Sequence, residues 1–176
     1  MDIKQLDELN NIILGCINND QSSQGKLYDM FHARMMKTAM RYSLDAHQAE
    51  DIVSMSLLKC FQSISQYTFK GSFEGWLRRI VAYTAIDLIR ADKKYIRNTA
   101  FTDDDESIWV NEGDPMYYDH LLQLIDTLPP KVKTVFNLSV MEGYPHKQIA
   151  HMLNMSEGTS KWYLSEGRKM LREKLK

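Results

Sequence analysis

The sequence lacks the features that mark secreted, membrane-bound and metal-dependent proteins. Its 176 residues include only two cysteines, Cys16 and Cys60, and neither has a neighbour at metal-ligand spacing. Such usage is typical of buried thiols in a reducing cytosol. The first residues, MDIKQLDELNN, carry acids where a secretory signal carries bases, and no apolar run approaches the ~18 residues of a membrane span. We therefore expect a cytoplasmic protein with no membrane insertion.

Catalytic motifs are missing as well. The chain has no nucleophile motif and no glycine loop for phosphate. His47, Glu50 and Asp51 lie within one helical turn, but a di-metal carboxylate bundle needs Glu-x-x-His pairs from two helices, and there is no second such pair. His146 and His151 are five residues apart, the wrong spacing for one helical face. The sequence predicts no enzyme, no metal site and no cofactor.

The net charge is only -1, but its distribution divides the chain. Residues 1–97 hold 13 Lys and Arg against 11 Asp and Glu, and residues 119–176 hold nine against six. Residues 98–118 hold six acids and no base. Such a break in composition is expected of a linker. We therefore predict two mildly basic domains, 1–97 and 119–176, joined by an acidic linker, 98–118.

Apolar residues recur at helical spacing and no strand pattern is clear, so the predicted fold class is all-α. Four helices are predicted in the first domain, at about residues 3–18, 23–42, 47–65 and 73–94, with Asp45 capping the third. The predicted inward positions are Leu6, Leu9, Ile13 and Cys16; Leu27, Met30, Phe31, Met35 and Ala39; Val53, Leu57, Cys60, Phe61 and Ile64; and Leu77, Ile80, Val81 and Leu88.

Three helical patterns follow one another in the last third of the chain. The first starts after Pro129-Pro130, where a fixed φ favours a helix start. The second starts at Pro145 and ends at Asn154, a residue that tolerates the left-handed conformation of a tight turn. Ser156 then caps the third. Two short helices joined by such a turn form a helix-turn-helix, whose second helix can enter a DNA major groove.

The third of these helices has two unlike faces. Its narrow inward face consists of Ser160, Leu164, Gly167 and Leu171. The opposite side carries Lys161, Ser165, Arg168 and Arg172, with Trp162 and Lys169 beside them. Cations suit phosphate contacts, and arginine or lysine can read guanine edges. This face therefore indicates binding to duplex DNA, the alternative being a solvated face on a small bundle.

A second pattern, aromatic residues interleaved with cations, covers residues 61–97. It comprises Phe61, Tyr67, Phe69, Phe73, Trp76 and Tyr83, with Lys70, Arg78, Arg79, Arg90, Lys93, Lys94 and Arg97. Such a surface suits single-stranded nucleic acid or a flipped base, because bases stack on aromatic rings and phosphates pair with cations. The alternative is that the rings are core, which we prefer for Phe61 and Phe73 and leave open for Trp76 and Tyr83.

These segments resemble a known family. In the first domain, AEDIVSMSLLKCF is similar to a stretch with the pattern A-E-D-I-V-Q-E-T-F-L-K, and FKGSFEGWLRRIVAYTAIDLIR to F-x-x-W-L-x-x-I-A-x-N-x-x-x-D-x-x-R. In the second domain, LPPKVKTVFNL is similar to the pattern L-P-x-x-x-R-x-V-F-x-L. SEGTSKWYLSEGRKML is similar to the pattern S-E-G-T-V-K-S-R-L-x-R-A-R-K-x-L. Over about residues 9–175 the chain resembles the extracytoplasmic-function (ECF) sigma factors, small two-domain sigma subunits of bacterial RNA polymerase.

The resemblance implies three sets of contacts. The set expected to bind core polymerase is Glu50, Asp51, Ser54, Leu58 and Lys59. The set expected to read and melt the minus-ten element is Phe69, Lys70, Trp76, Arg79, Tyr83, Asp87, Arg90 and Lys94. The set expected to read the minus-thirty-five duplex is Thr159, Lys161, Trp162, Tyr163, Ser165, Arg168 and Lys169.

The partners that the resemblance implies are core RNA polymerase, double-stranded and locally melted promoter DNA, and an anti-sigma factor. The acidic run Asp103-Asp104-Asp105-Glu106 has two interpretations. It threads the nucleic-acid channels of the polymerase, as such linkers do in the family, or it is a solvated spacer. The alternative to a sigma factor is a helix-turn-helix regulator that acts without replacing a sigma subunit.

The chain departs from the family pattern at positions that bear on promoter preference. Ser160 stands where the family has valine. Gly167 stands for alanine, which is expected to weaken a helix interior by ~1 kcal/mol. The other departures are Ser54-Met55 for a polar pair, Tyr83 for asparagine, and Trp162-Tyr163 for a small or polar pair.

Overall fold

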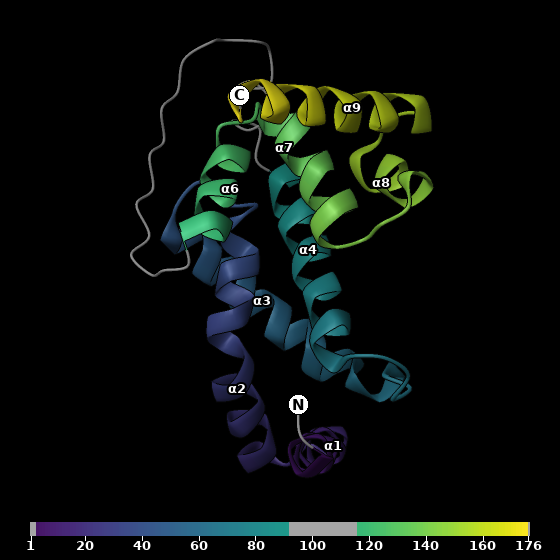
Figure 1. Ribbon diagram of the computed structural model, residues 1–176. Helices are drawn as coiled ribbons and strands as arrows, with labels where there is room; N and C mark the ends of the chain where they lie inside the picture. Colours follow the sequence, from purple (N-terminus) through teal and green to yellow (C-terminus); the bar gives the residue numbers. More distant parts are fainter. Residues whose placement is uncertain (1–2, 92–115, 176) are drawn as a thin grey trace. The chain divides into compact units, whose positions relative to one another are not determined.

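The structure, a computed structural model, describes residues 3–91 and 116–175 (Figure 1). Every element within these ranges is a helix, which confirms the all-α prediction. The chain forms two compact units, Met1–Leu88 and Ile89–Lys176, and each is considered by itself.

The first unit is built from α-helices and one short 3-10 turn. In chain order these are α1 (Ile3–Ile17), α2 (Gln21–Met40), α3 (Ala46–Ser63), η1 (Ile64–Gln66) and α4 (Phe73–Ala91), whose last three residues fall in the second unit. Two aspartates cap helix starts, because their carboxylates accept the backbone N–H of the residue three further on. Asp20 accepts from Ser23 at 2.8 Å, and Asp45 accepts from Gln48 at 2.7 Å. The predicted cap at Asp45 is therefore confirmed.

The core of the first unit follows narrow stripes along its helices. On α2 the stripe runs at four-residue spacing through Leu27, Phe31, Met35 and Ala39, all buried. Met30 lies off this stripe and is 40% exposed, so its predicted inward position was wrong. Leu6 was also predicted to face inward but is 48% exposed, because the whole first turn of α1, residues 4–8, is exposed. Helical spacing predicts which residues share a face, but it does not predict how much of that face a neighbouring helix buries.

The two cysteines are part of this core. Cys16 on α1 and Cys60 on α3 are both buried free thiols. Burial, with a smaller effect of Cys16, raises the pKa of Cys60 to about 12. Burial also raises the pKa of Cys16, helped by Asp20. Because the thiolate is the reactive form, both side chains are packing residues rather than nucleophiles at neutral pH.

The second unit contains the predicted helix-turn-helix. Its elements are α6 (Met116–Asp126), α7 (Pro130–Phe136), the π-helical turn η2 (Asn137–Met141), α8 (His146–Leu153) and α9 (Glu157–Lys174). Asn154 adopts the left-handed conformation, with φ 50, between α8 and α9. The Thr159 N–H donates to the Ser156 hydroxyl at 2.9 Å and caps α9. Both local predictions are confirmed, whereas α6 was not predicted.

The packing of α9 on α7 explains the glycine at position 167. Ser160, Leu164, Gly167 and Leu171 are all buried, so the predicted inward face of α9 is confirmed. A Cβ on Gly167 would lie 2.9 Å from Val132 Cγ1 and 3.5 Å from Phe136 Cδ2. The glycine therefore allows a closer approach of the two helices than an alanine would.

Gly167→Ala is expected to destabilise the second unit although alanine is the better helix former. Overpacking costs about 1–3 kcal/mol, against a propensity gain of about 1 kcal/mol. Adding Val132→Ala removes the atom that the new methyl would meet, so the double variant should be more stable than the two single effects predict. Urea unfolding measures both quantities.

Gly158→Ala is the matched control, since a Cβ there meets only Ser156 Oγ at 3.6 Å, an ordinary contact. This change on the same helix should leave stability unchanged or raise it by up to about 1 kcal/mol. If Gly167→Ala behaves like Gly158→Ala, close packing is not the reason for the glycine.

Candidate interfaces for polymerase and promoter DNA

The outer side of α3 presents an acid beside exposed apolar side chains. Asp51 and Ser54 of the predicted polymerase set are exposed, and Leu58 is 60% exposed. Met55, which replaces a polar residue of the family pattern, is 42% exposed on the same helix. Exposed leucine and methionine rimmed by polar groups form the kind of surface that a protein partner covers.

Two members of the polymerase set are engaged within the protein. His32 Nε2 on α2 lies 2.9 Å from Glu50 Oε1, so Glu50 ties α3 to α2. Lys59 Nζ lies 3.5 Å from Asp87 Oδ2 on α4, and this pair joins the polymerase set to the minus-ten set. Asp51, Ser54 and Leu58 are therefore the more accessible members of the set.

An aromatic cluster lies where α4 begins. The ring centroid of Trp76 is 5.6 Å from that of Tyr67 and 5.5 Å from that of Phe73. Phe73 and Tyr67 are buried, Trp76 is half-buried and Phe69 is 43% exposed. Phe73 is thus a core residue, as we preferred, and so is Tyr67. Phe61, for which we also preferred the core, is half-buried. The accessible edge of the cluster consists of Trp76 and Phe69.

The turn before α4 holds Phe69 in an unusual conformation. Its φ is +57, a region that costs a bulky residue on the order of 1–3 kcal/mol. The Tyr67 hydroxyl donates to the Gly71 carbonyl at 2.8 Å and closes the turn, in which Gly71 has φ +85. This closed turn presents both Phe69 and Lys70 at the surface.

The remaining minus-ten residues follow the solvent side of α4. Arg79, Tyr83, Asp87 and Arg90 are all exposed, Tyr83 to 44%. Their spacing places them along one side of the helix, opposite its buried stripe. Lys94 lies outside the described residues, as does the acidic run 103–106.

Sequence reasoning missed an arginine–glutamate network beside the aromatic cluster. Glu74 on α4 is 2.9 Å from Arg34 Nη1 on α2 and 3.1 Å from Arg78 Nη2. The Arg34 guanidinium lies over the Phe31 ring, 5.8 Å from its centroid. The four-residue spacing of Glu74 and Arg78 is a helix signal that could have been used. Nothing in the sequence indicates a contact with Arg34, forty positions earlier.

The outer face of α9 carries the predicted duplex-reading residues. Thr159, Lys161, Trp162, Ser165, Arg168 and Lys169 are exposed, and Tyr163 is half-buried. The rings of Trp162 and Tyr163 are 5.0 Å apart and contact each other edge to face.

The first turn of α9 concentrates charge. Lys161 Nζ is 2.8 Å from Glu157 Oε1. The hydrogen bond and charge of Lys161, followed by smaller effects of His146 and Lys147, hold the pKa of Glu157 below its usual value. The lysine predicted to read bases is thus paired with a carboxylate in the free chain.

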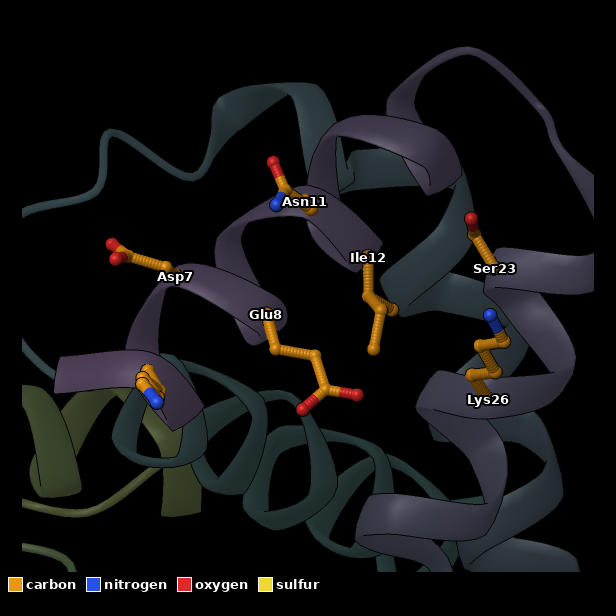
Figure 2. Close-up of a pocket in the computed structure, with 7 residues that line it drawn as sticks. Asp7, Glu8, Asn11, Ile12, Ser23 and Lys26 are labelled. Atoms are coloured by element: carbon orange, nitrogen blue, oxygen red, sulfur yellow. The ribbon is translucent and has the colours of Figure 1, made fainter. Parts of the chain in front are cut away.

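A pocket of about 470 Å³ lies between α1 and α2. Figure 2 shows α1 side chains on one side of it and α2 side chains on the other. The residues that line it are Lys4, Asp7, Glu8, Asn11, Ile12, Ser23 and Lys26. They mix both charges and include none of the residues predicted for polymerase or DNA.

Residues 3–91 and 116–175 contain no group of three or more His, Cys, Asp or Glu side chains arranged to hold a metal ion. In the same ranges, no helix combines the length and apolar character needed to cross a membrane.

Comparison with known proteins identifies the class. Residues 27–95 match sigma-70 region 2, and residues 118–171 match sigma-70, region 4. RNA polymerase sigma factor SigV of Bacillus subtilis (strain 168) is 30% identical over 142 residues, which cover 79% of this chain and 82% of SigV. ECF RNA polymerase sigma factor SigW of the same organism is 26% identical over 178 residues, 89% of this chain and 91% of SigW.

A third relative is longer. ECF RNA polymerase sigma factor SigE of Mycolicibacterium smegmatis is 30% identical over 149 residues, 81% of this chain, but the match spans only 57% of SigE.

Two solved structures share the fold. One is sigma factor RpoE in complex with the anti-sigma factor NepR from Bartonella quintana, with a TM-score of 0.56 and 16% identity over 86% of this chain and 95% of that one. The other is CnrH in complex with the cytosolic domain of CnrY, with a TM-score of 0.51 and 15% identity, covering 93% of this chain and 94% of that one.

The chain therefore carries two sigma-70 regions on an all-helical fold, which places it among the sigma subunits of RNA polymerase. It belongs to the ECF sigma factors. Proteins of this family direct the polymerase to promoters and start transcription, and they are in general initiation factors rather than enzymes. A regulator that leaves the sigma subunit in place is not favoured.

Trp76→Ala is expected to impair formation of the open complex more than that of the closed complex, because the aromatic edge would lose a stacked base worth about 1–3 kcal/mol. Permanganate footprints of melted thymines measure the effect. Trp76→Phe keeps a ring in the cluster and should melt nearly as well. Trp76 is half-buried, so circular dichroism must first show that the variant folds. A folded Trp76→Ala variant with normal footprints would rule out stacking.

Proposed function

We propose that the chain divides promoter recognition between its two helical parts. Residues 1–97 bind core RNA polymerase and recognise and melt the minus-ten element. Residues 119–176 read the minus-thirty-five element as duplex, and the acidic segment 98–118 links the two. The observation that carries this proposal is the presence of both sigma-70 regions in order, at 27–95 and 118–171. A regulator acting through a helix-turn-helix alone would need only the second.

The polymerase contact is assigned to Glu50, Asp51, Ser54, Leu58 and Lys59 on α3. Leu58 supplies an exposed apolar side chain and Asp51 a charge at its rim, an arrangement in which the buried anchor gives affinity and the rim charge guides orientation. Glu50 and Lys59 contribute by fixing α3 to its neighbours, Glu50 through its hydrogen bond with His32 on α2 and Lys59 through its ion pair with Asp87 on α4.

Melting is assigned to the aromatic edge and the face of α4 that follows it. Phe69 and Trp76 offer stacking surfaces, while Lys70 and Arg79 lie beside them for phosphates. Separated strands expose unpaired bases, which such a surface captures without needing hydrogen-bond readout. Tyr83, Asp87, Arg90 and Lys94 complete the proposed surface.

Duplex reading is assigned to Thr159, Lys161, Trp162, Tyr163, Ser165, Arg168 and Lys169. The second helix of a helix-turn-helix enters the major groove with its N-terminal end. Lys161 lies near that end of α9, and Arg168 lies seven residues further on, where the helix leaves the groove. Two modest DNA contacts on one chain strengthen each other through effective concentration.

The partners follow from these assignments. Core RNA polymerase and promoter DNA, both duplex and locally melted, bind the chain directly, and an anti-sigma factor holds it inactive. The solved RpoE structure contains an anti-sigma factor, which supports this last partner. The polymerase carries out the chemistry, so the chain itself catalyses no reaction. It works in the cytoplasm, where polymerase and chromosome meet.

Reconstitution with core polymerase tests the proposal. The chain alone should convert core enzyme into a promoter-specific enzyme, with defined start sites across a genome. Asp51→Arg should weaken core binding about tenfold while leaving binding to upstream duplex intact. Asp7→Arg, an equal charge reversal at an exposed site of α1, is the control and should bind core like the parent. If transcription requires a second sigma factor, the regulator interpretation holds instead.

Two substitutions on α9 should affect DNA binding in different ways. Lys161→Ala should cost about 1–3 kcal/mol and relax preference at a single base pair. Arg168→Ala should weaken binding to all sequences alike and make the salt slope shallower by about one unit. Selection from randomised upstream elements separates the two. Lys174→Ala is the control, because Lys174 lies at the far end of α9 and donates to the Thr127 hydroxyl at 2.7 Å. An unchanged consensus with Lys161→Ala would contradict this placement of α9.

A further inference from the structure

A buried polar pair joins the two helices of the helix-turn-helix. Ser160 on α9 is fully buried, although the family pattern has valine there. Its hydroxyl lies 2.9 Å from Nδ1 of His146, the first residue of α8. A buried hydroxyl without a partner destabilises a fold, so this contact compensates for the serine. It also fixes the orientation of the imidazole ring.

The orientation leaves the second ring nitrogen available. Nε2 is at the opposite edge of the ring from Nδ1, so it faces away from Ser160. His146 is half-buried rather than enclosed, and its neighbour Lys147 is exposed. In a helix-turn-helix on DNA, the first helix crosses the phosphate backbone while the second enters the groove. In this geometry α8 is the helix that meets phosphates, and His146 is in its first turn.

We infer that His146 donates a hydrogen bond from Nε2 to a phosphate of the upstream duplex, and that Ser160 is the positioning residue that aims the ring. The inference rests on the proposed reading of duplex DNA by residues 119–176. It adds to that reading a phosphate contact from α8, outside the α9 residues assigned above.

The Ser160 contact survives a change of charge on the ring. A hydroxyl can donate to a neutral Nδ1 and can accept from a protonated one. Protonation of His146 therefore leaves the helix pair intact, while a phosphate at Nε2 favours the charged form. Binding to duplex takes up a proton, so affinity is highest at low pH and falls as pH rises through the imidazole range.

The other charged groups around His146 are Lys147 on α8 and the paired Glu157 and Lys161 on α9. The pKa of Glu157 is held low by Lys161 and, to a smaller extent, by His146 and Lys147, so this carboxylate remains ionised. The turn η2, which also packs against α8, has no ionisable side chain.

The test uses the full chain and a duplex of the upstream element obtained by selection. Fluorescence anisotropy at pH 6, 7 and 8, at several salt concentrations, should show roughly five- to tenfold tighter binding at pH 6 than at pH 8. His146→Gln should abolish this ratio and lower the salt slope by about one unit at pH 6 but not at pH 8. His151→Gln, an exposed histidine of the same helix, is the matched control and should keep the parent ratio.

Ser160→Ala separates positioning from charge. It keeps an ionisable His146 but removes the hydroxyl that aims it, so the pH ratio should fall to less than half of the parent value. A parent-like ratio in this variant, with a normal circular dichroism melt, would overturn the positioning role. Calorimetry of the parent in two buffers of different ionisation enthalpy needs no variant. If it detects no proton uptake on duplex binding at pH 7, the phosphate contact is wrong.

Failure of the inference and failure of the proposed function give different results. Arg168→Ala reports on duplex reading without involving His146. If Arg168→Ala weakens binding and His146→Gln leaves the pH ratio unchanged, duplex reading stands and the histidine contact is wrong. If the full chain shows no preference for any upstream duplex, both are wrong.

Discussion

The burial of a narrow apolar stripe on α4 and on α9 is the constraint on which both proposed DNA surfaces depend. A helix has one rotational setting once its stripe is packed, so the residues opposite the stripe must face outward. Burial of Leu77 and Val81 sets α4, and burial of Leu164 and Leu171 sets α9. Gly167 also sets the distance between α9 and α7, because the missing side chain lets α9 approach Val132 closely. The packing of each stripe therefore decides which cations and aromatics face outward.

Local signals made much of this predictable. The cap at Ser156 and the turn at Asn154 depend on residues within a few positions of each other, and the stripe on α9 depends on a simple spacing. The tertiary contacts could not be predicted from the sequence. Leu6 is apolar at the right spacing, yet within residues 3–91 and 116–175 no segment covers the first turn of α1. The helix α6 was missed because its first residues fall in the stretch whose charge reads as a linker.

The candidate site shows the same division. Exposure of the α9 cations follows from the predicted stripe, but their partners do not follow from it. The pair between His146 and Ser160 joins residues fourteen positions apart, and Arg34 reaches Glu74 across forty. One signal was present nonetheless. A serine at a core position where the family has valine requires a hydrogen-bond partner nearby. The departure at Ser160 therefore indicated that a compensating hydrogen bond, here with His146, should be present.

Acids within the DNA surfaces have a further physical consequence. Lys161 is paired with Glu157, Arg34 and Arg78 share Glu74, and Lys59 reaches Asp87. An exposed ion pair of this kind contributes little to stability, so a phosphate or base edge in the right place can displace the carboxylate. Elsewhere along DNA the carboxylate competes with phosphate and repels it. For the proposed DNA surfaces, these pairs and a net charge of -1 would lower affinity for arbitrary sequence more than for a matched promoter.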